Sequence, residues 1–222
     1  MSFADAARFF DAIAGRYERS YALSSDESRR RMIQVLRELP PPPARVLDLG
    51  VGTGRELAAL LDAGYVPIGV DISRRMLERC ARRARPIALV HADLWHPLPF
   101  AANSFDAAVA LHGTLAHSPN EGALARLALD LARVVKAGGQ WIVEMPSPAW
   151  LERLGATDDA AEWSVRHTGP NQCVYEDHVV GERIEARVFS EQEWRAALAP
   201  HWTLRIQPLG DCEWSVVATL VT

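Results

Sequence analysis

The segment from Arg45 to Asp71 constrains the fold of this chain more than any other part. It contains two short apolar runs, Arg45–Leu49 and Val66–Val70, and a stretch of good helix formers between them that ends at Gly64. Short apolar runs of this length are typical of buried strands. A strand, a helix and a second strand in this order predict two parallel strands joined by a crossover helix.

A glycine-rich loop directly follows the first of these strands. Gly50, Gly52 and Gly54 can adopt positive φ and have no Cβ, so a ligand can lie against the backbone near the start of the next helix. Asp71 ends the second strand, where its carboxylate can accept hydrogen bonds from a ribose diol. Arg55 stands where the dinucleotide motif G-x-G-x-x-G has its third glycine. The loop therefore favours a nucleoside cofactor and disfavours a dinucleotide-dependent oxidoreductase.

The rest of the chain alternates between strand-like and helix-like patterns. The expected strands are 45–49, 66–70, 87–91, 105–111, 140–145, 202–209 and 214–221. Helices are expected between most of them, including one over 191–198 that Ser190 caps. Strands with interleaved helices predict an α/β fold with a doubly wound sheet.

Two regions depart from this alternation. Residues 3–19 and 26–39 have the apolar spacing of amphipathic helices and precede a run of four prolines. Residues 173–189 form two β-rich runs around Gly181-Glu182, which predicts a hairpin after the fifth strand. We expect one domain over 1–222, with an N-terminal helical cap (1–43), a cofactor-binding core (44–146), a lid or insertion (147–189) and a closing helix with strands (190–222).

Composition argues against several classes of protein. The net charge is −4, and the arginines concentrate in helical segments, where they are typical of solvated faces and not of a nucleic-acid surface. The three cysteines lack C-x-x-C spacing, and the histidines lack metal-ligand spacing, so neither a disulfide framework nor a metal site is expected. No signal peptide or membrane span is recognised. The sequence predicts a cytoplasmic protein without a membrane or nucleic-acid partner.

Four passages together carry a family resemblance. Leu47–Gly54 and Ile68–Asp71 resemble the first two motifs of the class I S-adenosylmethionine-dependent methyltransferases, and His91–Leu94 followed by Leu98–Asp106 resembles the passage between the third and fourth strands of their small-molecule members. The resemblance implies a mostly parallel seven-stranded sheet with an antiparallel last strand. It also implies S-adenosyl-L-methionine as cofactor, with Asp93 accepting a hydrogen bond from the adenine amine and Leu94 beside the ring.

The N-terminal segment adds a narrower resemblance. Phe10–Tyr21 is similar to a segment that closes over the cofactor in sugar-amine and glycine N-methyltransferases, which implies that Tyr17 and Tyr21 face the cofactor or the acceptor. Alternatively, Phe9, Phe10, Ile13 and Tyr17 form the apolar stripe of a packing helix. The full predicted cofactor set is Tyr17, Tyr21, Asp48, Gly50, Gly52, Gly54, Asp71, Ile72, Asp93, Leu94 and Leu111.

The expected end of the fourth strand supplies a candidate for proton transfer. Residues 111–117 resemble the strand-end loop of the same methyltransferases, in which a histidine at the position of His117 lines the acceptor pocket. An imidazole suits this role because its ordinary pKa is close to neutrality. His117 could instead start the helix before Ser118-Pro119. The segment 150–175, with Trp163, His167 and Asn171, is either a lid over a small acceptor or an excursion that covers a sheet edge.

These features predict an enzyme that transfers a methyl group from S-adenosyl-L-methionine to a nitrogen or oxygen of a small organic acceptor. The reaction would be an in-line displacement, in which the protein aligns the reactants and, where needed, removes a proton. The alternative is a degenerate methyltransferase domain that binds the cofactor or a partner chain without turnover. The sequence does not determine the oligomeric state.

Overall fold

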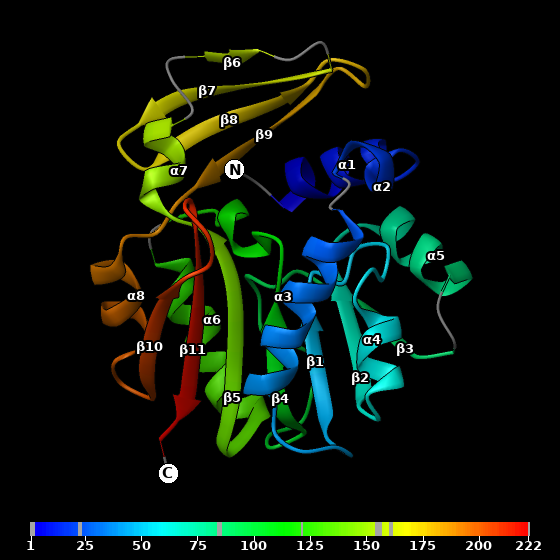
Figure 1. Ribbon diagram of the computed structural model, residues 1–222, viewed down its shortest axis with the longest axis vertical. Coiled ribbons are helices and arrows are strands. Elements are labelled where there is room, and N and C mark those ends of the chain that lie inside the picture. Colours follow the sequence, from blue (N-terminus) through cyan, green and yellow to red (C-terminus); the bar gives the residue numbers. More distant parts are fainter. Residues whose placement is uncertain are drawn as a thin grey trace.

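A seven-stranded sheet forms the centre of the molecule (Figure 1). The computed structural model describes residues 3–21, 24–83, 86–120, 122–153, 157–159 and 162–221. The strand order is β10-β11-β5-β4-β1-β2-β3. The strands are β1 (Arg45–Leu49), β2 (Val66–Asp71), β3 (Ala88–His91), β4 (Phe105–Ala110), β5 (Val135–Pro146), β10 (Trp202–Pro208) and β11 (Glu213–Leu220).

The direction of the strands confirms the predicted doubly wound sheet with an antiparallel last strand. β1 pairs in parallel with β2 and β4, β2 with β3, and β4 with β5. β11 is antiparallel to both of its neighbours, β5 and β10. β2 and β3 follow on one side of β1, whereas β4 and β5 follow on its other side. Such a reversal of strand order leaves a crevice at the carboxyl ends of the strands, here between β1 and β4. The expected cofactor loop lies at this edge.

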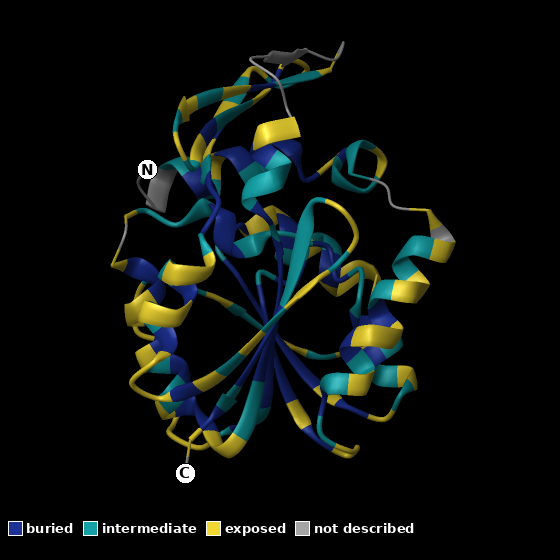
Figure 2. Cartoon of the chain, turned by 60° about the vertical axis from the view of Figure 1, so that its left-hand side comes forward, coloured by how far each residue is buried: buried dark blue, intermediate teal, exposed yellow. Residues whose placement is uncertain are grey.

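One face of the sheet is covered by α6 (Ala123–Val134) and α8 (Glu191–Leu198). The fully buried rings of Trp141 on β5 and Trp194 on α8 have centroids 6.1 Å apart. The indole of Trp202 donates a hydrogen bond to the carbonyl of Ala128 at 3.0 Å. Figure 2 shows the buried strands at the centre, with exposed residues on the outward faces of the helices.

The start of α8 is held by the predicted cap. The Ser190 hydroxyl accepts from the Glu193 N–H, and the Glu193 carboxylate accepts from the Ser190 N–H at 2.7 Å. This reciprocal capping box satisfies two amide groups that have no partner within the helix. We expect Ser190→Ala to lower the free energy of unfolding by about 1 kcal/mol. Urea denaturation measures this loss, and Ser104→Ala serves as the control, because the Ser104 hydroxyl donates to the Ala101 carbonyl at 2.7 Å in the loop before β4.

The opposite face is covered by α3 (Ser25–Glu38) and α4 (Leu57–Asp62). Met32 and Val35 on α3 pack in one cluster with Val46 on β1 and Ile142 on β5. The helix begins after Ser24, whose side chain accepts from the Glu27 N–H. α3 therefore belongs to the layers of the core, although it falls within the predicted helical cap.

The first predicted helix consists of two shorter ones, α1 (Phe3–Ile13) and α2 (Tyr17–Ser20), which lie above the carboxyl edge of the sheet (Figure 1). Turn residues 14–16 separate them, and the Arg16 N–H donates to the Ile13 carbonyl at 2.9 Å. The remaining helices are α5 (Arg74–Arg83), η1 (Thr114–His117) and α7 (Pro148–Arg153).

A second, antiparallel sheet stands over the same edge. Its strands, in spatial order, are β6 (Thr157–Asp159), β7 (Trp163–Gly169), β8 (Gln172–Asp177) and β9 (Glu182–Arg187). β8 and β9 confirm the predicted hairpin, with Gly181 at a φ of 69° in its turn. β6 and β7, which the sequence did not predict, extend this hairpin. Figure 1 shows α1 between the small sheet and the top of the large one.

Candidate active site

The loop between β1 and α4 presents bare backbone at the switch point. The N–H groups of Gly50 and Val51 both donate to the Val70 carbonyl, at 2.8 and 3.0 Å, which ties the loop to β2. Gly50 has a φ of 72°, and a Cβ there would lie 2.4 Å from Thr114 Cγ2. Only glycine fits this position without displacing Thr114, and it leaves the backbone exposed to the adjoining cavity.

Gly54 has a different place from the other two glycines. Its φ is 78°, and a Cβ there would lie 2.6 Å from the Cys80 sulfur and 3.0 Å from Leu57. Gly54 does not line either of the cavities described below. The structure therefore brings Gly50 and Gly52 to the site and places Gly54 in the contact between the loop and α5.

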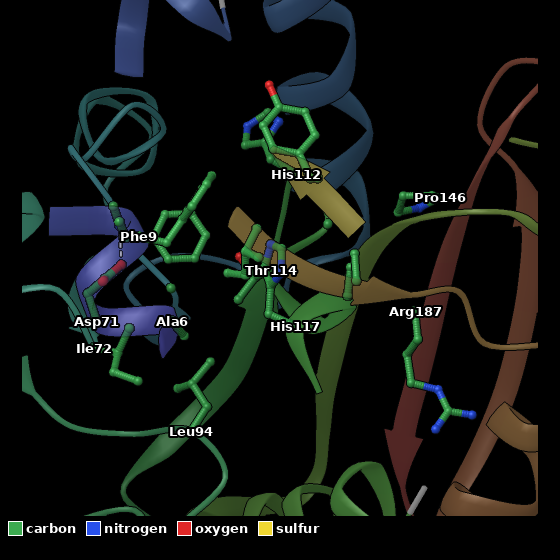
Figure 3. Close-up of a pocket in the computed structure, with 18 of the residues that line it drawn as sticks. Ala6, Phe9, Asp71, Ile72, Leu94, His112, Thr114, His117, Pro146 and Arg187 are labelled. Atoms are coloured by element: carbon green, nitrogen blue, oxygen red, sulfur yellow. Dashed lines mark hydrogen bonds between the residues drawn. The ribbon is translucent and has the colours of Figure 1, made fainter. Parts of the chain in front are cut away.

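A cavity of about 280 Å³ opens above this loop. Figure 3 shows Asp71, Ile72 and Leu94 toward one side of it and Pro146 and Arg187 toward the other, with His117 and Thr114 between. The predicted residues that line it are Tyr17, Tyr21, Gly50, Gly52, Asp71, Ile72, Asp93, Leu94 and His117. These residues line one cavity in the folded chain, although they lie up to 100 positions apart in the sequence.

Asp71 connects β2 to the glycine loop. Its carboxylate accepts from the Gly52 N–H and from the Ser73 N–H, each at 2.8 Å. Burial raises the pKa of this carboxyl to about 6, against these hydrogen bonds, which lower it. Two N–H donors leave further lone pairs on the two oxygens. Asp71 can therefore hold the loop and still accept hydrogen bonds from a ligand.

This raised pKa gives a pH prediction for ligand binding. Hydroxyl donors of a ribose need the ionised carboxylate, so the affinity for S-adenosylhomocysteine should fall by about tenfold per pH unit below pH 6 as Asp71 is protonated. Calorimetric titration between pH 5 and 8 measures this dependence. Asp71→Asn is the matched control, and a wild-type profile as flat as that of the variant would contradict the prediction.

Protonation of Asp71 also affects stability, in the opposite direction. The pKa of this carboxyl is near 4 in the unfolded chain and about 6 in the folded chain. Between pH 4 and pH 6 the folded chain therefore binds this proton more tightly than the unfolded chain does. The free energy of unfolding falls as the pH rises through this range, because the buried carboxyl must ionise. Acidification to pH 5 thus weakens ligand binding without a loss of stability at this residue. The two effects can be measured separately.

Asp93 and Leu94 lie at the end of β3, beside the same cavity. The Asp93 carboxylate accepts from the Trp95 N–H at 3.0 Å, and its other oxygen lies 2.7 Å from the His96 ring nitrogen. Leu94 is buried and belongs to the main core cluster. Trp95 also lines the cavity and was not predicted. The carboxylate keeps free lone pairs for an amine donor next to an apolar surface.

A smaller cavity of about 30 Å³ also adjoins the glycine loop. Tyr17, Asp48 and Leu111 line it, and Tyr17 lines the larger cavity too. Asp48 is 4% exposed, and its Oδ2 has no hydrogen-bond partner among the residues that the structure describes. Burial raises its pKa to about 8, because the charged form has lost its hydration. A cationic donor in the small cavity would satisfy this oxygen and favour the ionised form.

His112 and Glu56 form a pair at this cavity that the sequence analysis did not identify. The His112 ring nitrogen Nε2 hydrogen-bonds to the Glu56 carboxylate. Burial opposes the charged imidazole, but the bond to Glu56 outweighs it and raises the pKa of His112. His112 also has a φ of 52°, which is uncommon outside glycine. The two residues are 56 positions apart, so no local pattern could predict their contact.

Tyr17 at the start of α2 and Tyr21 directly after it both line the cavity. The rings of Tyr17 and Tyr21 stack at 4.9 Å, and the Arg55 guanidinium lies 5.5 Å from the Tyr17 ring. The alternative interpretation of this segment also holds in part, because Phe9 and Ile13 are buried in a cluster with Met76. α1 and α2 thus form both a packing surface and a wall of the cavity.

His117 ends the short helix η1 and reaches the cavity. Its Nδ1 lies 3.1 Å from the carbonyl of Glu185 on β9, and its ring meets Phe10 edge to face at 5.2 Å. A carbonyl can only accept, so Nδ1 carries the proton in this contact and Nε2 of the neutral ring is an acceptor. Burial lowers the pKa of His117. The next helix begins at Ala123, so His117 does not start it.

The small sheet supplies the wall facing the glycine loop. Cys173 and Tyr175 on β8 line the cavity, as does Trp150 on α7. Trp163 stacks on Tyr175 at 5.7 Å with an interplanar angle of 17°. His167 and Asn171 do not line the cavity, and residues 154–156 and 160–161 of the predicted lid lie outside the described part of the chain.

Over the described ranges, no three His, Cys, Asp or Glu side chains come together as metal ligands do. None of the helices described in the structure combines the length and the apolar character needed to cross a bilayer.

Comparisons with known proteins agree with this geometry. Residues 46–139 match the family model described as methyltransferase domain. The chain is 36% identical over 141 residues to a demethylmenaquinone methyltransferase of Corynebacterium kroppenstedtii, covering 63% of this chain and 58% of that protein. The chain spans 58% to 66% of the length of the first three curated relatives.

Solved structures share the fold over nearly the whole chain. The CcbJ methyltransferase from Streptomyces caelestis superposes with a TM-score of 0.81 at 18% identity, over 98% of this chain and all of that one. CalS10, an amino pentose methyltransferase from Micromonospora echinaspora solved with S-adenosylmethionine bound, superposes with a TM-score of 0.65 at 17% identity, over 92% and 96%. Residues 46–139 therefore match a methyltransferase domain, and the chain as a whole has the fold of the class I methyltransferases.

Proposed function

We propose that this chain transfers a methyl group from S-adenosyl-L-methionine to a nitrogen or oxygen of a small organic acceptor. The observation that carries the proposal is the continuity of one cavity. Gly50, Gly52, Asp71 and Asp93 line this cavity together with apolar side chains of α7 and the small sheet, and Figure 3 shows His117 between the side of Asp71 and the side of Pro146. A transferase needs a nucleoside half and an acceptor half that open into each other.

The residues present fit a sulfonium nucleoside. Gly50 and Gly52 leave room beside the loop, Asp71 has acceptor capacity for two ribose hydroxyls, and Asp93 for an exocyclic amine. The unpartnered Oδ2 of buried Asp48 fits the amino end of the same molecule. When bound, the cofactor supplies an activated methyl group, so the protein need not provide a nucleophile.

The protein's own part is alignment, exclusion of water and proton removal. α1, α2 and the small sheet close the cavity on the sides that the large sheet leaves open. Tyr17 and Tyr21 would face the cofactor from α2, with Ile72, Leu94 and Leu111 beside it. His117, with its acceptor nitrogen Nε2, would receive a proton from an acceptor that carries one.

Ligand-induced stabilisation tests the cofactor assignment. S-adenosylhomocysteine should raise the melting temperature, whereas NAD should not, because only a ligand that prefers the folded state stabilises it. The absence of any shift with S-adenosylhomocysteine, in protein that unfolds cooperatively, would refute the proposal.

A degenerate methyltransferase domain that binds cofactor or a partner chain remains the second candidate. The unpaired Asp48 and the intact loop support a functional cofactor site, but they do not require turnover. Transfer of label from S-adenosyl-L-methionine with a labelled methyl group into a panel of amines, phenols and acids separates the two. Cofactor binding without transfer to any of these acceptors would favour the degenerate domain.

We infer a cytoplasmic location and no nucleic-acid or membrane partner. The inference is supported by the three free cysteines, two of them buried, which suit a reducing compartment. It is also supported by the mild net charge of −4, which gives no broad basic surface. Retention on a heparin column at low salt would contradict the absence of a nucleic-acid partner.

A further inference from the structure

The acceptor side of the cavity has a chemical character that selects among acceptors. Its walls come from α1, α7 and the small sheet, and most of their side chains are apolar. They include Phe10, Trp150, Cys173, Tyr175, Ile184 and Ala186. Aromatic rings on two sides of a cavity favour a flat apolar ligand, which can stack or meet them edge to face.

No carboxylate on this side is available to an ammonium group. Among the described residues that line the cavity, the only acids are Asp71 and Asp93, and Figure 3 places Asp71 and Leu94, the neighbour of Asp93 in sequence, on the nucleoside side. Burying an unpaired cation among apolar side chains is costly. An alkylamine, which is protonated at neutral pH, would therefore have to lose its proton before it bound.

The polar groups on the acceptor side are paired or neutral. The guanidinium of Arg187 points away from the cavity in Figure 3 and donates to Glu193 at 2.6 Å. His112 is paired with Glu56. Burial raises the pKa of Tyr21 and Tyr175, and of the Cys173 thiol to about 11, so all three stay uncharged.

Of the polar groups discussed for the acceptor side, His117 is the one with a ring nitrogen that can accept a hydrogen bond from the methyl acceptor. Its Nδ1 proton is held by the Glu185 carbonyl at 3.1 Å, which leaves Nε2 as a neutral hydrogen-bond acceptor. Its contact with Phe10 keeps the ring against the apolar wall. A hydroxyl on an aromatic ring offers one donor for Nε2 and carries no charge to desolvate.

From this arrangement we infer that the methyl acceptor is a neutral aromatic hydroxyl compound, methylated on oxygen, with His117 as the proton acceptor. The inference rests on the proposed function and narrows it. The hydroxyl proton passes to His117 Nε2, the oxygen electron pair forms the bond to the methyl carbon, and the carbon–sulfur bond breaks toward sulfur. The sulfonium becomes a thioether, and His117 then releases its proton to water.

Three probes test the acceptor class: 2-naphthol, the amine 2-(aminomethyl)naphthalene with the same flat ring system, and the amino sugar glucosamine. S-adenosylhomocysteine binding is measured first by calorimetry, and its absence would refute the proposed function itself. With that binding intact, 2-naphthol should bind the loaded protein and be methylated roughly tenfold or more faster than either amine at pH 7. Faster methylation of an amine, or no binding of 2-naphthol, would overturn the inference.

Substitutions at Ala186 test the missing carboxylate directly. Ala186→Asp places an acid in the apolar wall, and Ala186→Asn is its uncharged match of the same size. The aspartate variant should gain affinity for 2-(aminomethyl)naphthalene relative to the asparagine variant, because it supplies the partner that an ammonium needs. Equal affinity in the two variants, with both folded by circular dichroism, would mean that charge on this wall does not select the acceptor.

The role of His117 has its own readout. His117→Gln should reduce 2-naphthol turnover at pH 7 by roughly 100-fold, with S-adenosylhomocysteine affinity nearly unchanged. Turnover of the variant should recover as the pH approaches that at which naphthol ionises in solution, because the proton is then already removed. A loss that is equal at all pH values would assign His117 a merely structural role and overturn this part of the inference.

Discussion

Replacement of Arg16 by methionine is expected to lower the free energy of unfolding by about 3 to 5 kcal/mol. Arg16 is 8% exposed and lies in the turn between α1 and α2. Its Nη1 donates to the carboxylate of Asp177 on β8 at 2.5 Å, and its Nη2 to that of Glu162. Without the guanidinium, the Asp177 carboxylate, only 1% exposed, would stay buried without its cation.

Two further variants separate the buried pair from the surface contact beside it. Arg8 and Glu182 join the same two regions at 2.8 Å, but the Arg8 side chain is 58% exposed, so Arg8→Met should lower the stability far less than Arg16→Met does. In Arg16→Met combined with Asp177→Asn, the neutral amide can still accept from Val179 and Val180, and much of the loss should be recovered. Urea denaturation measures all three. If Arg16→Met lowered the free energy of unfolding less than Arg8→Met, the buried Arg16–Asp177 pair would not be needed for stability.

Replacement of Asp71 by alanine is expected to weaken S-adenosylhomocysteine binding by about 1 to 3 kcal/mol. The variant removes the acceptor proposed for the ribose hydroxyls. It also removes the acceptor of the Gly52 and Ser73 N–H groups, so the loop loses its hydrogen bond to the last residue of β2. The structure thus adds a second consequence, a loss of stability of about 1 to 3 kcal/mol for each buried N–H left without a partner.

A control must separate the ligand contact from this loss of stability. Asp106 serves, because its carboxylate also holds backbone, accepting from the Arg45 N–H at 2.8 Å, but lies at the opposite end of the sheet from the cavity. Asp106→Ala should lower stability and leave the affinity for S-adenosylhomocysteine unchanged. Calorimetry at a temperature where all variants are folded compares them. If the Asp71 and Asp106 variants bound S-adenosylhomocysteine with equal affinity, Asp71 would not be a ligand of the ribose hydroxyls.

Some of the candidate site could be predicted because its residues lie close together in sequence. The glycine loop and the ends of β1 and β2 fall within one strand–helix–strand unit, and the chemistry of each residue follows from its position at a strand end. Asp93 and Leu94 follow β3 in the same way. Gly54 shows the limit of such reasoning, because it lies in the same motif but its missing Cβ serves contact with Cys80.

Other parts depended on contacts between distant segments. His112 pairs with Glu56 because β4 and β1 are neighbours in the sheet, so the segments that follow the two strands meet. The positive φ of His112 has no sequence signature. The two additional strands β6 and β7 gain their partners only by pairing with the predicted hairpin. The apolar wall around His117 combines α1 with β8 and β9, more than 150 residues apart.

The sequence by itself determined the alternation of strands and helices, the antiparallel last strand through its family resemblance, and the cofactor loop. Local backbone preferences and the spacing of apolar residues encode these features. Only the tertiary structure decided which groups are left without charge partners at the acceptor side, and which tautomer the Glu185 carbonyl imposes on His117. Burial and the pairing of side chains from distant segments control these properties, and neither exists until the chain has folded.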